Sequence, residues 1–463
     1  MGNELESEHA TSNMASYGFA SMSREFVQIA FGTYVFFYYE AEIGLNVWLI
    51  GIGLIIFAIY NAINDPLIGY LTNRPFKFTK KWGRRFPLIM LGGLPMGFSY
   101  FLVFAPPTTD PNTGALVLFG WLIFTTCLYD TLHSLFYVNF SSLFPDKFRS
   151  QSERRKAAGI QITLGVLGLG LGSILPPLFI NFGDFQSYIL QGIVAMLFGL
   201  ITMIIAIPGC REDKKSIEKY LESLEKKPER GTFVGETKNA LKITSFLAFL
   251  VLYVMYQAAT TSMIASIPYV IRFILDLPAS ATTLIMAAML IGTIASVPLW
   301  IKLAHRYNDN RKVMLIAITL MAIFTSPLIF LESYILIIIT MLLWGATLGG
   351  WWSMLFPVMS DIVDESVVRY QKREEGTYNG ILQFFGRLGN IIQVLSFAIV
   401  HTLTGFVEGQ ETQSSSALVG IHMHLGLVPM ICLFIAALVF WKWYKLIPER
   451  VTQNQQKIKE MDL

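Results

Sequence analysis

Residues 46–72 read NVWLIGIGLIIFAIYNAINDPLIGYLT, and residues 73–85 continue with NRPFKFTKKWGRR. A helix needs about 20 mostly apolar residues to cross the hydrocarbon core of a bilayer, and the first segment exceeds that length. The second segment holds six Lys or Arg, and basic residues mark the cytoplasmic side of a membrane span. The stretch therefore predicts a membrane-spanning helix followed by a cytoplasmic loop.

The composition of the whole chain supports a polytopic, all-α membrane protein. Of the 463 residues, 54% are hydrophobic and only 14% are charged, whereas soluble domains carry about 25% charged residues. The net charge of +3 is small and indicates no role in binding nucleic acid. The three cysteines are too widely spaced for a disulfide framework or a metal site, and we predict no metal and no cofactor.

The pattern of apolar segments predicts twelve membrane-spanning helices. Each segment is long enough to cross the bilayer, and the polar first dozen residues lack the features of a cleavable signal peptide. The predicted helices are residues 15–40, 46–72, 86–105, 114–143, 159–181, 187–208, 243–272, 279–302, 312–331, 333–360, 376–406 and 418–446.

The basic residues alternate between the loops and thereby set the orientation. The even-numbered loops, the middle segment and the C-terminal tail hold 32 of the 35 Lys and Arg. Because positive charge marks the cytoplasmic side, both termini are predicted to be cytoplasmic in a multi-pass protein of the plasma membrane. The three basic residues outside this pattern are Arg24, Arg272 and Arg387.

The chain is predicted to consist of two related halves. Residues 211–242 are charged, lack an apolar run and separate an N-terminal bundle (1–210) from a C-terminal bundle with a short cytoplasmic tail (243–463). Pro66-Leu67 in the second helix matches Pro298-Leu299 in the eighth, and SSLFP at 141–145 matches SMLFP at 353–357. Such repeats are typical of secondary transporters, and the plan of six helices plus six resembles the major facilitator superfamily.

Ionisable groups inside membrane helices are costly, by roughly 2.5–3.5 kcal/mol on insertion scales, and usually functional. Arg24 and Glu25 lie in the first helix, where the carboxylate can accept hydrogen bonds from a hydroxylated cargo. Alternatively, both lie at the membrane surface. Asp65 precedes Pro66, with Asn61 one turn earlier on the same face. We predict that Asn61 and Asp65 serve cation coupling; the alternative is a structural bond to the loop beyond.

Further polar residues lie deep in the fourth, tenth and eleventh helices. Asp130 and His133 are three residues apart and share a face, so they form a candidate proton relay or sugar-binding pair, or else polar contacts between helices. Arg387 requires an acidic partner or an anionic cargo. Trp352 offers an aromatic surface for a sugar ring, although core packing is equally common. With Arg24, Glu25 and Gln383, these residues form the candidate substrate-binding set.

An acidic cluster ends the tenth helix on the predicted cytoplasmic side. Together with the basic residues that follow, it is predicted to form salt bridges between the two halves, and these bridges would break when this side of the transporter opens. The predicted gate residues are Asp361, Asp364, Glu365, Arg369 and Arg373.

Two motifs resemble the glycoside–pentoside–hexuronide:cation symporter family. They are NAINDPLIG at 61–69 and WGRRFP at 82–87, and the resemblance extends to DIVD at 361–364 and along the whole chain. It implies that Glu25 matches a sugar-binding aspartate and that Asp65 matches a cation-site aspartate. It also implies sugar-site roles at Trp352 and His133, and places Arg387 at a lysine position of the family.

The sequence departs from the family at other site positions. Asn61 and Tyr137 each stand where the family has an aspartate, Ser141 stands for a tryptophan, and Gln161 for an arginine. These departures favour protons over sodium as the coupling ion, or uncoupled facilitated diffusion, and leave a cargo other than a galactoside open.

The sequence thus predicts a cation-coupled symporter of a small hydroxylated solute, acting as a monomer, with H⁺ or Na⁺ as the coupling ion. A transporter of lysolipids or other amphiphiles is the alternative, since a member of the same family carries lysolipids. A non-transporting membrane sensor is a remote third. No nucleophile–base or metal motif indicates an enzyme.

Overall fold

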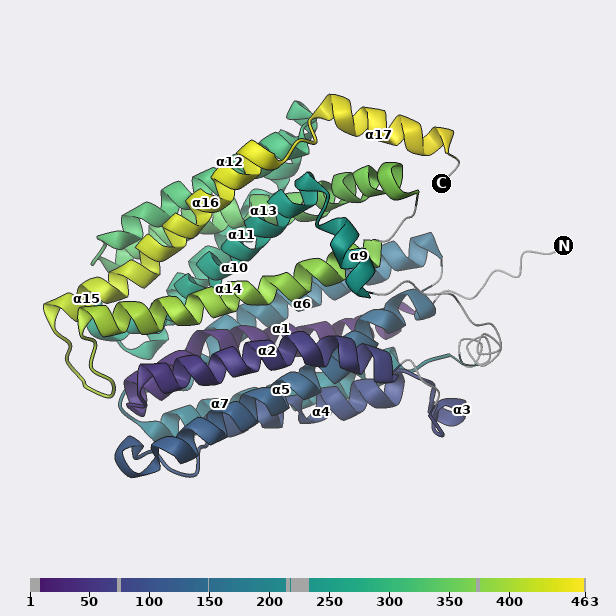
Figure 1. Ribbon diagram of the computed structural model, residues 1–463. Helices are drawn as coiled ribbons and strands as arrows, with labels where there is room; N and C mark the ends of the chain where they lie inside the picture. The colour runs from purple at the N-terminus through teal and green to yellow at the C-terminus, as the bar shows by residue number, and fades with distance from the viewer. Residues whose placement is uncertain are drawn as a thin grey trace. The chain divides into compact units, whose positions relative to one another are not determined.

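The computed structural model describes residues 9–72, 76–148, 150–213, 217, 233–371 and 375–461. All regular secondary structure within these ranges is helical, as the sequence predicts. The chain divides into two compact units, Met1–Pro228 and Glu229–Leu463, and Figure 1 shows that each is a bundle of long helices.

Within its described residues, unit 1 contains six long helices and two short ones. The first long helix ends in a π-helical segment, η1, and α3 is a single turn in the loop after α2. The elements are α1 (Thr11–Phe37), η1 (Tyr38–Glu42), α2 (Val47–Thr72), α3 (Thr79–Trp82), α4 (Phe86–Val103), α5 (Pro111–Lys147), α6 (Gln151–Phe179) and α7 (Phe185–Cys210).

Unit 2 repeats this plan and adds helices at both of its ends. Its last membrane helix is built from α15, η5 and α16 in succession. The elements are α9 (Phe233–Ala240), α10 (Thr244–Tyr269), η2 (Val270–Ile274), η3 (Ala279–Ala281), α11 (Thr282–Tyr307), α12 (Asn310–Thr325), η4 (Ser326–Ile329), α13 (Tyr334–Tyr370), α14 (Glu375–Thr404), α15 (Ser415–His422), η5 (Met423–Leu427), α16 (Val428–Trp443) and α17 (Pro448–Glu460).

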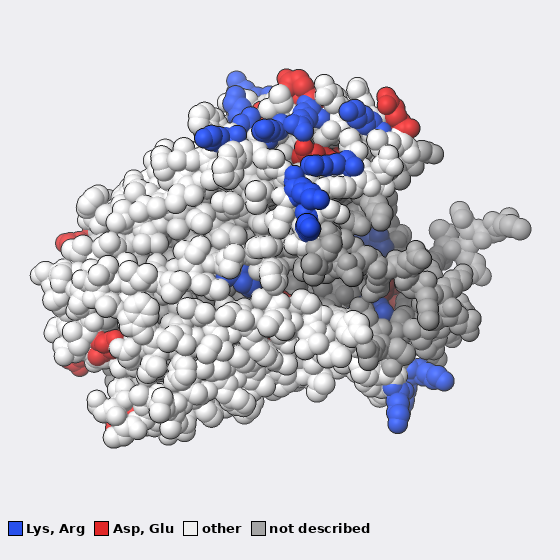
Figure 2. Space-filling model, in the orientation of Figure 1, with Lys and Arg blue, Asp and Glu red and all other residues white. Residues whose placement is uncertain are grey.

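Eleven helices in the described ranges are long and apolar enough to cross a membrane, and they correspond to the second through twelfth predicted spans. The remaining predicted span is α1, which has 27 residues but is less apolar because it carries Arg24, Glu25 and several serines. In Figure 2, the visible flanks of the helices are largely white, and Lys and Arg gather around α17 at one end of unit 2.

The helices of each unit pack in the same order. In unit 1, α1 packs on α6 and α7, α2 on α5, and α4 on α5 and α7. In unit 2, α10 packs on α14 and α16, α11 on α13, and α12 on α13 and α16. Small residues permit close approach of membrane helices; at Gly168 and Gly172 of α6, an added Cβ would lie 2.2 Å and 2.4 Å from carbonyl oxygens of α1.

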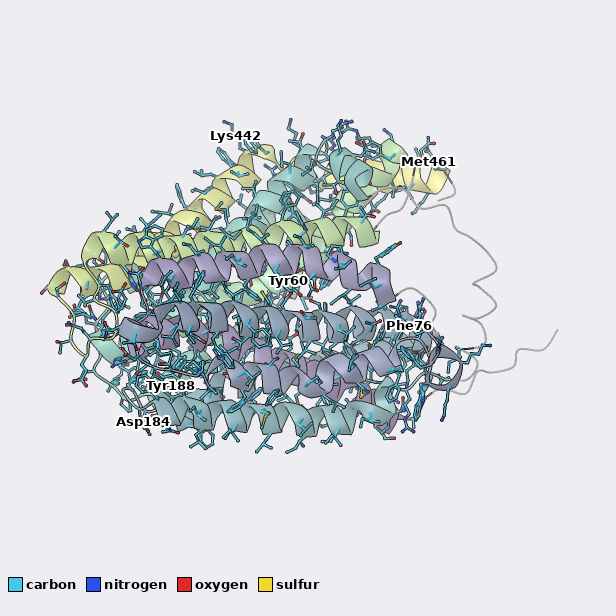
Figure 3. All side chains as sticks on the ribbon, turned by 60° about the horizontal axis from the view of Figure 1, so that its bottom comes forward. Tyr60, Phe76, Asp184, Tyr188, Lys442 and Met461 are labelled. Atoms are coloured by element: carbon cyan, nitrogen blue, oxygen red, sulfur yellow. The ribbon has the colours of Figure 1, made fainter. Side chains whose placement is uncertain are left out.

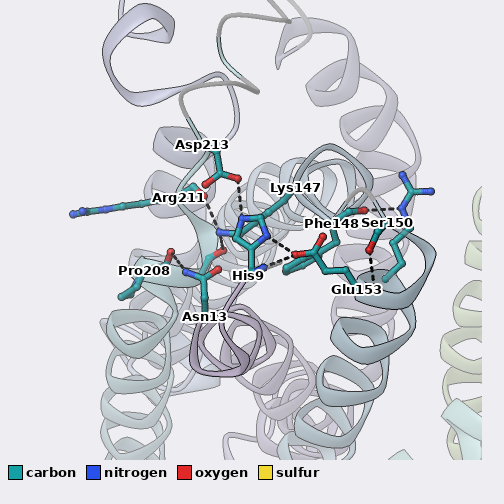
Figure 4. Close-up of polar contacts among 11 residues, drawn as sticks. His9, Asn13, Lys147, Phe148, Ser150, Glu153, Pro208, Arg211 and Asp213 are labelled. Carbon is teal, nitrogen blue, oxygen red and sulfur yellow. Dashed lines mark hydrogen bonds and ion pairs between the residues drawn. The ribbon is translucent and has the colours of Figure 1, made fainter. Parts of the chain in front are cut away.

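Polar contacts tie the predicted cytoplasmic end of unit 1 together (Figure 4). The His9 ring lies between Glu153 of α6 (2.5 Å) and Asp213 after α7 (2.8 Å). Lys147 Nζ donates to the carbonyls of Gly209 (2.7 Å) and Arg211 (2.9 Å), which satisfies acceptors that the end of α7 leaves unpaired. These bonds link the ends of α1, α5, α6 and α7.

The opposite end of unit 1 is held by Glu42 of η1. Its carboxylate accepts hydrogen bonds from the Tyr188 hydroxyl (2.7 Å) and the Gly183 amide (2.9 Å). Figure 3 labels Tyr188 and Asp184 at this end, Phe76 at the other and Tyr60 between them. Tyr60 therefore marks the middle depth of the bundle on α2.

Candidate functional site

A buried carboxylate lies between α2 and α5 at this middle depth. Asp130 of α5 is 2% exposed. It accepts hydrogen bonds from the side-chain amides of Asn61 and of Asn64, the latter at 2.9 Å. Asn61 follows Tyr60 directly, and Asn64 comes three residues later on the same helical face. The two amides stabilise a negative charge that would otherwise be costly in an apolar bundle.

A second carboxylate lies one turn further along the same helix pair. The Ser134 hydroxyl of α5 donates to Asp65 of α2. Pro66, which follows Asp65, lacks the N–H that would bond the Ala62 carbonyl, so it leaves an acceptor within α2. The α2–α5 cluster, defined as Asn61, Asn64, Asp65, Asp130 and Ser134, thus brings two carboxylates together.

One atom of the α2–α5 cluster is buried without a hydrogen-bond partner. It is the side-chain oxygen of Asn61, whose amide nitrogen faces Asp130. Buried polar atoms usually have a partner, so an orphan acceptor beside a carboxylate indicates a place where a proton or a cation can enter.

A second group of polar residues lies between α1 and α5. Arg24 forms an ion pair with its neighbour Glu25, and its Nε donates to His133 Nε2 at 3.3 Å. His133 Nε2 must therefore carry a lone pair, which makes the ring neutral. The Arg24 guanidinium also lies 4.0 Å from the Tyr137 ring centroid, a distance typical of a cation–π contact.

The α1–α5 cluster, defined as Arg24, Glu25, His133 and Tyr137, is accessible from outside the bundle. The Arg24 and Glu25 side chains are 20% and 28% exposed. Tyr129, His133 and Tyr137 follow one another at intervals of four residues and stack along α5 at centroid distances of 6.0 and 5.9 Å. A partly exposed ion pair beside a row of rings can bind hydroxyl groups and a sugar face together.

In unit 2, the candidate residues gather around aromatic side chains of α10. Trp352 Nε1 donates to the Tyr256 hydroxyl at 3.3 Å, while Trp351 stacks on the Tyr256 ring at 4.0 Å. Gln383 of α14 accepts from the Tyr253 hydroxyl at 3.4 Å. Arg387, one turn further along α14, is half-buried.

The predicted gate residues have partners within unit 2. Asp361 accepts from Asn310 at 2.9 Å, and Glu365 pairs with Arg450 of α17 at 2.9 Å. Arg369 donates to the Lys242 carbonyl at 3.2 Å. Asp364 is half-buried on α13, and Arg373 lies outside the described residues. The gating role of these residues stays a prediction.

Several residues of the site escape the sequence reasoning. Asn64, Ser134 and Tyr256 hold candidate residues in place, yet none is ionisable at neutral pH, so the search for charged groups passes over them. The spacing of Asn61 and Asn64 is the signal that finds one of them, since residues three apart share a helical face.

A buried carboxylate, a second partly buried one and a partly exposed ion pair, set in bundles of membrane-spanning helices, are typical of a membrane transporter. The family model described as "MFS/sugar transport protein" matches residues 16–447. The chain therefore belongs to this family of the major facilitator fold, whose members are transporters and not enzymes. It is a multi-pass membrane protein that carries a small molecule.

Two curated relatives differ in the cargo that their names state. The chain is 20% identical over 441 residues to a sodium-dependent lysophosphatidylcholine symporter 1 of Gallus gallus, which covers 87% of this chain and 80% of that protein. It is 23% identical over 434 residues to an isoprimeverose transporter of Lactiplantibacillus pentosus, and the alignment covers 92% of this chain and 87% of that protein.

The fold resembles that of solved transporter structures. The nucleoside transporter NupG superposes with a TM-score of 0.62 at 13% identity and covers 94% of this chain and 99% of its own. At this identity the likeness establishes the fold alone.

Proposed function

We propose that this protein is a proton-coupled symporter of a small hydroxylated solute, such as a sugar or glycoside, and works by alternating access in the plasma membrane with both termini cytoplasmic. The observation that carries the proposal is Asp130, a carboxylate 2% exposed and held by two amides between α2 and α5. Intramembrane carboxylates commonly serve ion or proton transfer.

The amide partners suit a carboxyl that gains and loses a proton. While Asp130 is ionised, Asn61 and Asn64 donate to it. When Asp130 is protonated, its O–H needs an acceptor, and a rotation of the Asn61 amide presents the side-chain oxygen that now lacks a partner. An amide can therefore pair with either state of the carboxyl.

Sodium is the alternative coupling ion. The Asn61 side-chain oxygen and the carboxylates of Asp65 and Asp130 are the kind of hard oxygen donors that bind hard cations. However, the amide nitrogens already face both Asp130 oxygens, and sodium binding would require both amides to turn away.

The α1–α5 cluster is the proposed cargo site in unit 1. Glu25 can accept hydrogen bonds from hydroxyl groups once cargo displaces Arg24, and Arg24 can donate to the same cargo. The rings of His133 and Tyr137 offer a stacking face. Both clusters share α5, so binding of cargo at His133 and a change of charge at Asp130, three residues away, act on the same helix.

A lysolipid or other amphiphile is the second candidate cargo. The similarity to the lysophosphatidylcholine symporter supports it, and so does Arg24, because a partly exposed guanidinium can pair with a phosphate. A phosphate headgroup would compete with Glu25 for Arg24, whereas a sugar would bind both.

Uptake into proteoliposomes tests the proposal. The purified protein is offered labelled pentosides, hexosides, glucuronides and lysophosphatidylcholine under an imposed pH gradient or an imposed sodium gradient. We expect accumulation of a hydroxylated solute driven by the pH gradient, and competition by sugars rather than by lysolipids. Accumulation that responds only to sodium, or to neither gradient, would contradict proton coupling. If lysolipids compete for uptake and sugars do not, the cargo is a lysolipid or another amphiphile.

A further inference from the structure

The exposed sides of α12 and α16 end in a group of basic and aromatic side chains. α12 packs on α16, and the Arg311 guanidinium donates to the Trp441 carbonyl at 2.6 Å. The start of α12 and the end of α16 therefore lie side by side, at the end of unit 2 that the sequence predicts to be cytoplasmic. Figure 2 shows Lys and Arg gathered at this end of the unit.

The exposed side of α16 is apolar along the length of the helix. It consists of residues three or four apart, which share one side of a helix, and each of them is 45% exposed or more. These residues are Ile431, Phe434, Leu438 and Trp441. Because α16 is part of a helix long and apolar enough to cross a membrane, acyl chains are the surroundings that suit this side.

The exposed side of α12 changes from uncharged to basic at the same end. Ile323, Thr319 and Ile316 lie along it at intervals of three or four residues, and none of them is buried. Lys312 is the next residue on this side, in the first turn of α12, and it is exposed. On α16, Lys442 follows the apolar side in the same way. Two neighbouring helices thus present an apolar surface that ends in ammonium groups.

Lysines and aromatic rings occur together where this surface ends. We define the α12–α16 lysine cluster as Lys312, Lys442 and Lys445, which are all exposed. The Lys312 ammonium lies 4.1 Å from the Tyr307 ring centroid. Trp443 is exposed and follows Lys442, which Figure 3 labels. Trp and Tyr rings beside basic residues are typical of the level at which lipid headgroups lie.

The acidic side chains at this end do not neutralise the lysines. Asp309 accepts from the Lys312 amide and caps α12, and Asp361 accepts from the first residue of α12 at 2.9 Å. Glu365 forms an ion pair with α17 at 2.9 Å, and Glu449 is exposed at the start of α17. Among the described residues, no acidic side chain forms an ion pair with the α12–α16 lysine cluster. The cluster therefore carries uncompensated positive charge.

A phosphate group attached to acyl chains matches this surface. Lysine ammonium groups bind phosphate as point charges, and basic residues directly beyond a membrane helix attract anionic lipids. A free phosphate ion would contact the lysines alone, whereas a phospholipid would also cover the apolar sides of α12 and α16. Because the basic and the apolar parts are continuous, they favour one occupant that has both chemistries.

We propose that the α12–α16 lysine cluster binds the headgroup of an anionic phospholipid, whose acyl chains lie along the exposed sides of α12 and α16. The site uses no residue of the α1–α5 cluster or of the α2–α5 cluster. It does not depend on which cargo or which coupling ion the transporter uses.

Melting temperatures of the full-length protein test the proposal. The protein is purified in a neutral detergent and titrated with dioctanoyl phosphatidylglycerol, with dioctanoyl phosphatidylcholine or with glycerol 1-phosphate. A ligand that binds the folded state raises the melting temperature. We expect phosphatidylglycerol to raise it more than either of the other two, and the rise to weaken as salt is added, because salt screens exposed charges.

A variant that lacks the cluster locates the site. Each basic residue removed should weaken the apparent affinity for phosphatidylglycerol about fivefold, so the three changes together should weaken it about a hundredfold. The variant combines Lys312→Gln, Lys442→Gln and Lys445→Gln. The matched control removes the same charge from exposed lysines of α9 and α17 and should keep the wild-type affinity; it combines Lys238→Gln, Lys457→Gln and Lys459→Gln.

Equal losses of affinity in the two triple variants would overturn the proposal. The wild-type titrations decide the question even if a variant fails to fold. Equal stabilisation by phosphatidylcholine and phosphatidylglycerol would show that the headgroup charge is not recognised. Equal stabilisation by glycerol 1-phosphate would show an anion site that does not use acyl chains, and either result contradicts an anionic phospholipid as the occupant.

Discussion

The helix pair α2–α5 of unit 1 and its counterpart α11–α13 of unit 2 have matching lengths and prolines, but the side chains between the two helices differ. Both α5 and α13 have 37 residues, and matched prolines lie at 66 and 298. Aligned on these prolines, the positions of Asn61, Asn64 and Asp65 become Thr293, Ser296 and Val297 in unit 2.

The partner helices α5 and α13 also differ, because polar residues of α5 are replaced by non-ionisable residues in α13. Aligned on SSLFP and SMLFP, the positions of Asp130 and His133 of α5 become Leu342 and Gly345 of α13. The hydroxyl of Thr293 bonds the Met289 carbonyl of its own helix. Polar side chains thus reach across α2–α5, whereas those at the matched positions of α11 bond within the helix.

Apolar residues take the place of the carboxylates in unit 2, and Gly345 takes the place of His133. An added Cβ at Gly345 or at Gly292 would lie 2.0 Å from a carbonyl oxygen of the facing helix. The comparison shows that the same repeated helix pair can have two different roles. The pair α11–α13 packs closely through small residues, whereas α2–α5 holds ionisable groups at a cost in free energy. This difference supports the proposal that coupling lies in unit 1.

The largest effect is expected where the glycine packing is broken. Gly345→Ala places a methyl group 2.0 Å from the Met289 carbonyl oxygen, so the two backbones must separate. We expect a loss of about 3 kcal/mol or more, seen as a lower melting temperature in detergent and a lower yield of monodisperse protein. The matched control is Gly380→Ala on α14, where nothing lies within 4 Å. Equal stability of the two variants would contradict the close packing.

A smaller effect is expected from removing one amide of the α2–α5 cluster. Asn64→Ala deletes a donor to Asp130, and hydrogen bonds between membrane helices contribute about 1–2 kcal/mol. The melting temperature should fall, and the pH dependence of transport should shift. Thr72→Val is the control, because among the described residues the Thr72 hydroxyl bonds the Ile68 carbonyl within α2. If the pH dependence of transport is unchanged in Asn64→Ala, the Asn64 amide has no role in proton coupling.

The smallest effect is expected at the starts of the two long helices. Asp110 caps α5 through Asn112, whereas Ser333 starts α13 without a side-chain cap. Hydrogen bonds from Thr113 and Asn112 hold the pKa of the Asp110 carboxyl below its usual range. Its contribution to stability is therefore present above the unfolded pKa of about 3.9 and is lost as pH falls through the folded pKa.

We accordingly expect Asp110→Ala to lower the melting temperature slightly at neutral pH, with the difference from wild type vanishing in acid. Ser333→Ala should change nothing at either pH. A difference at Asp110 that persists in strong acid would assign the effect to lost packing and not to the charged cap.

The sequence predicts the positions of the membrane helices better than it predicts the contacts between their side chains. Hydropathy and charge locate the helices, because both follow from what a bilayer accepts. The π-helices η1, η2 and η5 add local turns that no apolar pattern marks. Asp130 and His133 share a face by spacing, yet Asp130 turns to the amides of α2 and His133 to Arg24. Which neighbouring helix a side chain meets depends on packing across the bundle.

The central claim is that Asp130 couples a proton to transport. The most direct measurement compares wild type with Asp130→Asn in proteoliposomes, using cargo accumulation under a pH gradient and cargo exchange without one. The asparagine keeps the size of the side chain and cannot ionise. We predict that Asp130→Asn still exchanges cargo but no longer accumulates it. Accumulation equal to wild type under the pH gradient would contradict the account.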